Sequence, residues 1–97
     1  MRLGAGFVKQ VVSGDFSFNH GSTFHRLEAT EPAFANLAKS SNKTDGLSHR
    51  VLNVGPFSIT LRDGDRTVVH LGSDQATWIA SDGESWSHMG VENVRST

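Results

Sequence analysis

Two copies of one turn signal, nineteen residues apart, constrain this chain more than any other feature. The run 57–61 leads into Arg62-Asp63-Gly64, and the run 76–80 leads into Ser81-Asp82-Gly83. An acid follows each turn, and a second run rich in β-branched or aromatic residues comes after it. Extended runs on either side of a glycine-containing turn are typical of β-hairpins. The stretch 56–89 therefore predicts two consecutive hairpins.

The glycine of the first turn indicates how its strands pair. In a three-residue hairpin loop the third residue commonly adopts the left-handed conformation, which glycine tolerates best. This register places Leu61 opposite Asp65 and gives one apolar face, made of Phe57, Ile59, Leu61, Val69 and Leu71. A two-residue type I′ loop would shift the register by one residue and turn Val68 and His70 to that face instead. The apolar alternation favours the three-residue loop.

The second turn, treated in the same way, places the two tryptophans of the chain opposite each other. Trp78 then faces Trp86, and Glu84 and His88 lie on the same face. Such a cross-strand pair contributes roughly 0.2–1 kcal/mol to a hairpin. The pair could seal one end of the core, or it could form an exposed platform that stacks a sugar or nucleobase or anchors a partner protein. The candidate ligand or interface residues are therefore Trp78, Trp86, His88 and Glu84.

The segment 81–86 also resembles the Asp-box turn of sialidase-like propeller blades, which reads Ser-x-Asp-x-Gly-x-Thr-Trp, although the spacing here is shorter. In that family the motif is a structural turn and not a catalytic one. A chain of this length cannot form a propeller, so the resemblance implies a turn and no activity.

A helix is predicted over about residues 31–40. Thr30 can cap its start, Glu31 complements the helix dipole, and Pro32 falls in the first turn, where its missing N–H does no harm. The residues at helical spacing form one narrow apolar stripe: Phe34, Leu37 and Ala38. A stripe this thin requires a sheet to pack against.

The remaining runs predict further strands. The N-terminal strands are expected at 7–12, 16–18 and 23–27, and Asn19-His20-Gly21 is expected to form a hairpin loop that sets Phe16 opposite Phe24. Later strands are expected at 49–54 and, after a bend at Gly90, at 91–94. Strands segregated from one helix indicate an α+β fold. We expect a single domain, 1–97, with a strongly curled, mainly antiparallel sheet or partly open barrel of about seven to eight strands and the helix packed on it.

Composition excludes several partner classes. The net charge of -1 gives no basic patch for nucleic acid or an anionic membrane, and the absence of cysteine excludes disulfides and thiolate chemistry. No apolar run approaches the roughly 18 residues of a membrane span, and residues 1–6 lack the apolar core of a signal peptide. We expect a cytoplasmic protein without a cofactor.

The five histidines form none of the usual metal-binding motifs, so no metal site is predicted. A general base could come from His25, His70 or His88, with a nearby acid among Asp63, Asp65, Asp82 and Glu84. Turn chemistry already accounts for these acids. The sequence has no nucleophile elbow, phosphate-binding loop or dinucleotide fingerprint, so no catalytic residue is assigned.

Three functions remain open. The leading hypothesis is a non-enzymatic binding or protein-interaction module, with self-association as a homodimer or binding of another protein. The second is a binder of a small ligand or carbohydrate on a Trp78/Trp86 platform. The third is a small hydrolase or isomerase based on histidine and a carboxylate.

Overall fold

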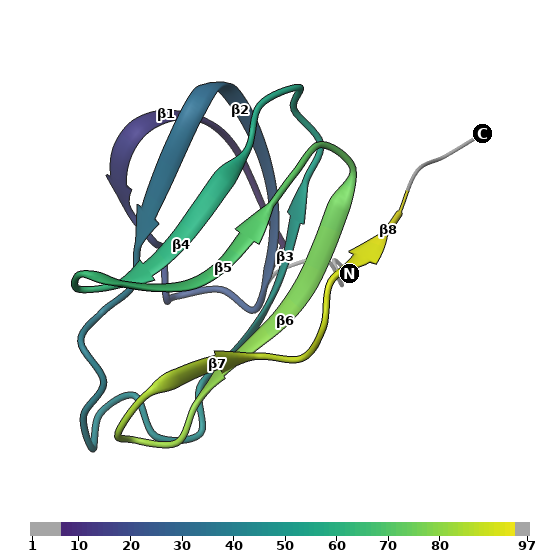
Figure 1. Ribbon diagram of the computed structural model, residues 1–97. Coiled ribbons are helices and arrows are strands. Elements are labelled where there is room, and N and C mark those ends of the chain that lie inside the picture. The colour runs from purple at the N-terminus through teal and green to yellow at the C-terminus, as the bar shows by residue number, and fades with distance from the viewer. Residues whose placement is uncertain (1–6, 95–97) are drawn as a thin grey trace, which may run out of the picture.

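The chain folds as a nearly closed barrel of mixed β-sheet (Figure 1). The computed structural model describes residues 7–94; the prediction that residues 1–6 are not a signal peptide concerns residues outside this range. The strands are β1 (Phe7–Ser17), β2 (Phe24–Asn36), β3 (Ser48–Asn53), β4 (Ile59–Asp63), β5 (Arg66–Leu71), β6 (Gln75–Ser81), β7 (Trp86–His88) and β8 (Glu92–Asn93). Their main order is β5-β4-β2-β3-β6-β7, with β1 on β2 and β8 on β6.

Strand β2 belongs to both halves of the barrel. It runs parallel to β1, then pairs in parallel with β3 through Phe24–Leu27 and with β4 through Ala33–Asn36. The amide of Val54 donates to the Leu27 carbonyl, and the amide of Ala33 donates to the Ser58 carbonyl. Strand β3 therefore pairs with the first part of β2, and the next strand along the chain, β4, pairs with its last part.

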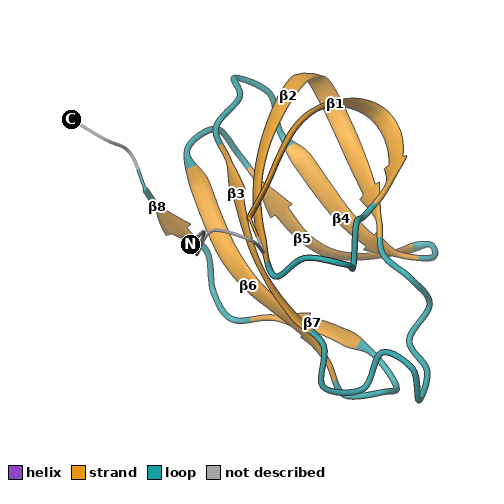
Figure 2. Ribbon diagram, turned by 180° about the vertical axis from the view of Figure 1, so that it is seen from behind, coloured by secondary structure: helices purple, strands orange, loops and turns teal. Residues whose placement is uncertain are grey.

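The predicted helix at 31–40 and the α+β class are wrong, because residues 31–36 continue β2, residues 37–40 are irregular, and the described residues contain no helix (Figure 2). Burial alternates with a period of two: Ala33, Ala35 and Leu37 are buried, while Phe34 faces outward. The guanidinium of Arg62 lies 4.3 Å from the centre of the Phe34 ring. Packing on two neighbouring strands thus outweighs the helix propensity of alanine. No helix in the described range is long and apolar enough to cross a membrane.

Pro32 fits this strand because of its place in the pairing. The pairing of β2 with β3 ends at Leu27, and its pairing with β4 begins at Ala33. Pro32 lies in the interval where neither strand hydrogen-bonds to β2. A proline, which cannot donate to a ladder, is tolerated at such a break.

The predicted N-terminal hairpin is also wrong. Strands β1 and β2 are parallel, and Phe16 aligns with Ala35 instead of Phe24. The predicted strands 7–12 and 16–18 form one continuous strand with a bulge between them, where Gly14 has φ +56°. Figure 1 shows β1 and β2 arching together, which lets a short connection join two parallel strands. The sheet is consequently mixed and not mainly antiparallel.

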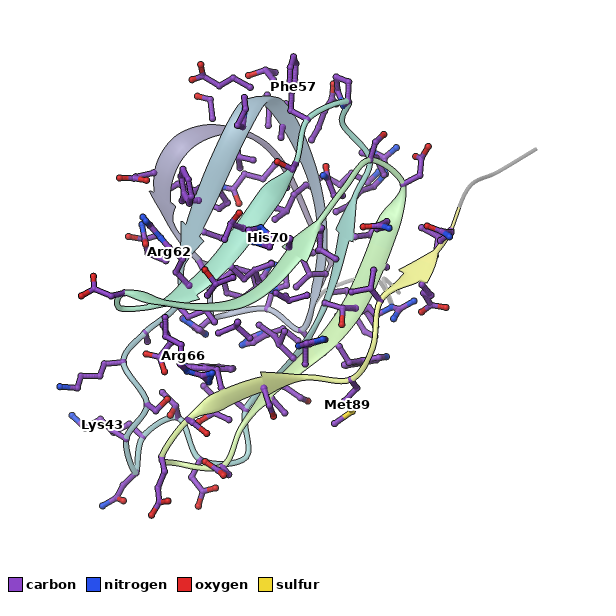
Figure 3. The ribbon with its side chains drawn as sticks, in the orientation of Figure 1. Lys43, Phe57, Arg62, Arg66, His70 and Met89 are labelled. Atoms are coloured by element: carbon purple, nitrogen blue, oxygen red, sulfur yellow. The ribbon has the colours of Figure 1, made fainter. Side chains whose placement is uncertain are left out.

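The β4–β5 hairpin contributes to the core as expected, but in another register. Asp63 pairs with Arg66 around a Gly64-Asp65 turn, and a bulge follows before Leu61 pairs with Val69. The faces are nevertheless those predicted for four buried residues: Ile59, Leu61, Val69 and Leu71. The predicted inward position of Phe57 is wrong, since this side chain precedes β4 and is exposed (Figure 3). The bulge also buries Val68, which strict alternation would place outside.

The barrel closes where β5 meets β7. The Arg66 guanidinium donates to the backbone carbonyl of Trp86, and Figure 3 shows Arg66 between these two strands. The predicted bend at Gly90 is confirmed by its φ of +74°, and β8 then pairs with β6. These contacts hold the C-terminal segment against the sheet.

Gly55 lies where the β3–β4 connection crosses β2. A Cβ atom at this position would lie 2.4 Å from the nitrogen and 2.6 Å from the oxygen of Ala29, both backbone atoms. The buried side chain of Asn53 fixes the same connection: its amide group donates to the carbonyls of Phe57 and Leu71, and its oxygen accepts from the Gly55 amide. Only glycine allows this approach without moving β2.

We predict that Gly55→Ala lowers the free energy of unfolding by at least about 2 kcal/mol, since a backbone clash cannot relax by a rotamer change. Urea denaturation followed by circular dichroism measures the loss. The matched control is Gly72→Ala, whose Cβ would meet only the flexible Gln75 side chain at 3.3 Å and is expected to cost less than about 1 kcal/mol. Equal losses for the two variants would contradict this account of the crossing.

Candidate functional site

The two tryptophans lie on opposite faces of the sheet, which corrects the predicted Trp78–Trp86 contact. Ser81 pairs with Trp86 around a four-residue loop, so the register differs by an odd number from the one predicted. The carboxylate of Asp82 organises this loop by accepting hydrogen bonds from the Glu84 and Ser85 amides, both at 2.9 Å. The same hydrogen bonds lower the pKa of Asp82. The extra loop residue turns Trp86 inward and leaves Trp78 outside.

Trp86 is a core residue. Its side chain is fully buried, and its indole N–H donates to the Ala38 carbonyl at 2.8 Å. Its ring lies beside those of His20 and His49, with centroid distances of 5.3 and 5.9 Å. The indole thereby joins β7 to the segment that follows β2.

Trp78 ends a row of side chains that crosses the outer face of three adjacent strands. Phe24 of β2 aligns with Arg50 of β3, and Arg50 aligns with Trp78 of β6. The rings of Phe24 and Trp78 meet edge to face at 6.0 Å, and the Arg50 guanidinium lies 5.9 Å from the Trp78 ring centre. The ladder therefore presents two aromatic rings and one cation side by side.

An open groove of about 280 Å³ adjoins this row. It is lined by Arg50, Trp78, Met89, Gly90, Val91 and Glu92, and we call it the Trp78 groove. Arg50 forms an ion pair with Glu92, so the charged groups of the groove neutralise each other. Met89 is 69% exposed, and Figure 3 shows it projecting from the connection between β7 and β8. Val91 and Phe24 are also exposed. The groove is therefore open to solvent and combines apolar side chains with one ion pair.

The other sequence candidates lie apart from the Trp78 groove. Glu84 and His88 are exposed and are not among its lining residues. Among the described residues, no hydrogen bond or ion pair joins His25, His70 or His88 to one of the acids considered for catalysis. His70 instead shares a 2.8 Å hydrogen bond with the Thr60 hydroxyl. The geometry thus assembles no histidine–carboxylate pair for the hydrolase hypothesis.

A cluster of three histidines inside the barrel was missed from the sequence. His25 and His49 are buried, and His20 is partly buried beside them. The Nδ1 atom of His20 lies 3.1 Å from Nε2 of His49, and the other ring nitrogen of His49 is 2.8 Å from the Ser22 carbonyl. His25 Nε2 reaches the same carbonyl at 2.9 Å. The phenyl ring of Phe18 packs against all three imidazoles.

The hydrogen-bond partners assign one tautomer to each ring. The Ser22 carbonyl can only accept, so Nδ1 of His49 and Nε2 of His25 carry protons. The Ala38 amide donates to Nε2 of His20 at 2.9 Å, so the proton of His20 lies on Nδ1 and points at the free Nε2 of His49. Each of these hydrogen bonds has one donor and one acceptor when all three rings are neutral. Nε2 of His25 and Nδ1 of His49, which are 3.4 Å apart, both donate to the Ser22 carbonyl and not to each other.

The surroundings keep the cluster neutral. Burial lowers the pKa of His20 to about 4, with a further contribution from His49 and His25. Burial also lowers the pKa of His25 and of His49, in each case against the opposing effect of the Ser22 carbonyl. No carboxylate among the described residues hydrogen-bonds to any of the three rings.

The cluster does not have the geometry of a metal site. His49 turns Nε2 toward His20 and Nδ1 toward His25, so no single point is close to a nitrogen of all three rings. In the part of the chain that the structure describes, no group of three or more histidine, aspartate or glutamate side chains is arranged to hold a metal ion.

Comparisons of the sequence with known protein families and with characterised proteins, and of the fold with solved structures, find no match. The function is therefore argued from the Trp78 groove on the outer face and the histidine cluster on the inner face.

We predict that the two tryptophans differ in accessibility and in their contribution to stability. Acrylamide is expected to quench the fluorescence of Trp78 in a Trp86→Phe variant far more strongly than that of Trp86 in a Trp78→Phe variant. Trp86→Ala is expected to lower the free energy of unfolding by about 3–5 kcal/mol, whereas Trp78→Ala is expected to cost about 1 kcal/mol or less. Similar quenching and similar losses would show that the strand register is wrong.

We also predict that the free energy of unfolding falls as the pH is lowered from about 7 to about 4.5. The pKa values of the three histidines lie below 6.5 in the folded chain, so the unfolded chain takes up protons first. Their stabilisation is complete above pH 6.5 and is lost progressively toward pH 4, with a slope of at most about 1.4 kcal/mol per pH unit for each ring. Urea denaturation at several pH values measures the slope. His49→Asn is expected to reduce it and His88→Gln to leave it unchanged; a stability independent of pH in this window would refute the prediction.

Proposed function

We propose that this protein is a non-enzymatic interaction module that self-associates as a homodimer through the Trp78 groove. The observation that carries the proposal is the outward-facing row of exposed Phe24 and half-buried Arg50 and Trp78, which lies beside exposed Met89 and Val91. Tryptophan, arginine, phenylalanine and methionine are the residue types most enriched at protein interfaces, and the first two dominate hot spots.

The chemistry of the groove favours an apolar protein side chain over a sugar. Carbohydrate hydroxyls need free donors and acceptors beside an aromatic ring, but the two charged groups that line the groove, Arg50 and Glu92, are engaged with each other in one ion pair. The platform of two tryptophans expected from the sequence is not formed, because Trp86 is buried on the other face. A flexible methionine adapts well to an apolar partner.

The charges of the groove favour a second copy of this chain as the partner. A two-fold axis brings the same patch of both subunits together, so the patch must complement itself. The Trp78 groove carries one cation and one anion beside its apolar residues. Arg50 of one subunit can therefore pair with Glu92 of the partner subunit while the apolar side chains stack. The cytoplasmic location expected from the sequence stays a prediction.

The first test is the oligomeric state of the unmodified chain and of one groove variant. Sedimentation velocity from about 1 to about 500 µM is expected to show a monomer–dimer equilibrium. Trp78→Ala is expected to weaken association by at least about tenfold, the effect of losing an interface anchor worth more than 1 kcal/mol. The matched control is Lys43→Glu, on an exposed loop away from the groove (Figure 3), which is expected to leave association unchanged.

The second test exchanges the charges between subunits. Arg50→Glu leaves two acids in each groove and Glu92→Arg leaves two cations, so each variant alone is expected to be monomeric. An equimolar mixture is expected to form a heterodimer, because each acid then faces a cation across the axis. Circular dichroism confirms that both variants are folded. A wild-type chain that remains monomeric at the highest concentration, or a mixture that does not associate, overturns the proposal.

A further inference from the structure

A continuous chain of hydrogen bonds crosses the end of the barrel that Trp86 occupies. The Trp86 indole donates to the Ala38 carbonyl, and the Ala38 amide donates to His20. His20 donates to His49, and His49 donates to the carbonyl of Ser22. The chain thus ties the 18–23 connection and the segment after β2 to strands β3 and β7.

We propose that His20, His25 and His49 form an acid-released latch that holds the 18–23 connection and the segment around Ala38 over the Trp86 end of the barrel. The proposal is independent of the dimer, because the histidines lie on the inner face of the sheet and the Trp78 groove lies on the outer face.

Protonation breaks the latch at defined atoms. A proton added to His20 must go to Nε2, where it meets the Ala38 N–H that this nitrogen accepts. A proton added to His49 must also go to Nε2, where it meets the Nδ1–H of His20. In both cases two donors face each other. The first case breaks the contact between the 18–23 connection and the segment around Ala38, and the second breaks the contact between the 18–23 connection and β3.

The neighbouring groups offer no compensation for this charge. Arg66 of β5 donates to the backbone carbonyl of Trp86, whose ring lies beside His20 and His49. The exposed charged or titratable groups nearest in the chain make no hydrogen bond to the cluster: Lys39, Lys43 and Asp45 on the segment after β2, and His88 on β7. Asp63 at the end of β4 accepts from the Ser40 hydroxyl instead. An added proton therefore gains no carboxylate partner among the described residues, and the neighbouring imidazoles disfavour it.

Release of the latch leaves most of the barrel intact. The histidine side chains take no part in the strand ladders, which backbone groups form. What opens is the 18–23 connection, which carries Phe18 and covers Trp86; these two side chains are 5% and 0% exposed in the closed form. Acid thus converts a closed barrel end into an exposed apolar surface while the sheet persists.

The test follows tautomers and amide protection by NMR on the full chain. At pH 7.5, long-range ¹H–¹⁵N spectra are expected to show the Nδ1–H form of His20 and His49 and the Nε2–H form of His25. Between pH 6.5 and pH 4.5 the protection factor of the Ala38 amide is expected to fall at least about tenfold more than those of amides in the β3–β6 ladder, which marks local and not global opening.

Two variants separate the latch from general acid sensitivity. His20→Gln keeps an acceptor for the Ala38 amide without a titrating ring, so its Ala38 protection is expected to persist at pH 4.5. His70→Gln removes a histidine outside the cluster and is expected to behave as the wild type. Repeating the measurement with Trp78→Ala, which removes the dimer contact, is expected to give the same local opening. Any one of four results overturns the latch. Two concern Ala38 protection: it stays undiminished in the wild type at pH 4.5, or it falls equally in His20→Gln. The other two are different histidine tautomers at pH 7.5 and an opening that disappears in Trp78→Ala.

Discussion

The passage of Gly55 across the backbone of Ala29 is the constraint on which the rest of the structure depends. Because of this crossing, β2 pairs with β3 along its first part and with β4 along its last part. A single 13-residue strand thus joins both halves of the barrel. The small residues of β2 on the inner side, Ala29, Ala33 and Ala35, are fully or almost fully buried where the two halves approach. Asn53 holds the crossing chain in place through the polar groups of its side chain.

Alternation along β3 then separates two surfaces with different chemistry. His49 points into the barrel and Arg50 points out, although they are consecutive residues. The same alternation along β6 places Ile79 inside and Trp78 outside. Because one peptide unit separates the two surfaces, each can be altered by substitution without direct contact with the other. This separation also makes the strand register decisive for function, since a shift of one residue would exchange the two sets of side chains.

The sequence predicts well where local chemistry decides and poorly where distant strands decide. Apolar alternation identified Ile59, Leu61, Val69 and Leu71 as core, and the glycine rule identified the bend at Gly90. Residues 31–38 satisfy both a helical and an extended pattern, and only the presence of β1 and β4 on either side selects the strand. The loop at Asp82 is one residue longer than its glycine suggests, which was enough to place Trp86 on the face opposite to that of Trp78. The three histidines of the cluster form no sequence motif. However, His25 and Leu27 alternate with the charged residues Arg26 and Glu28, a pattern that indicates an inward position for His25.

The pairing of β2 with two different strands, β3 and β4, has a consequence for the order in which the chain can fold. Hairpins β4–β5 and β6–β7 close over short loops and can form from neighbouring residues alone. Strand β2, in contrast, completes its pairing only when β4 is available as far as Arg62, and its pairing with β1 is parallel and non-local. During synthesis the first half of the chain therefore leaves the ribosome with exposed backbone edges and no complete sheet to join. We expect the barrel to assemble late and around its C-terminal hairpins, at the slower rates typical of non-local β topologies.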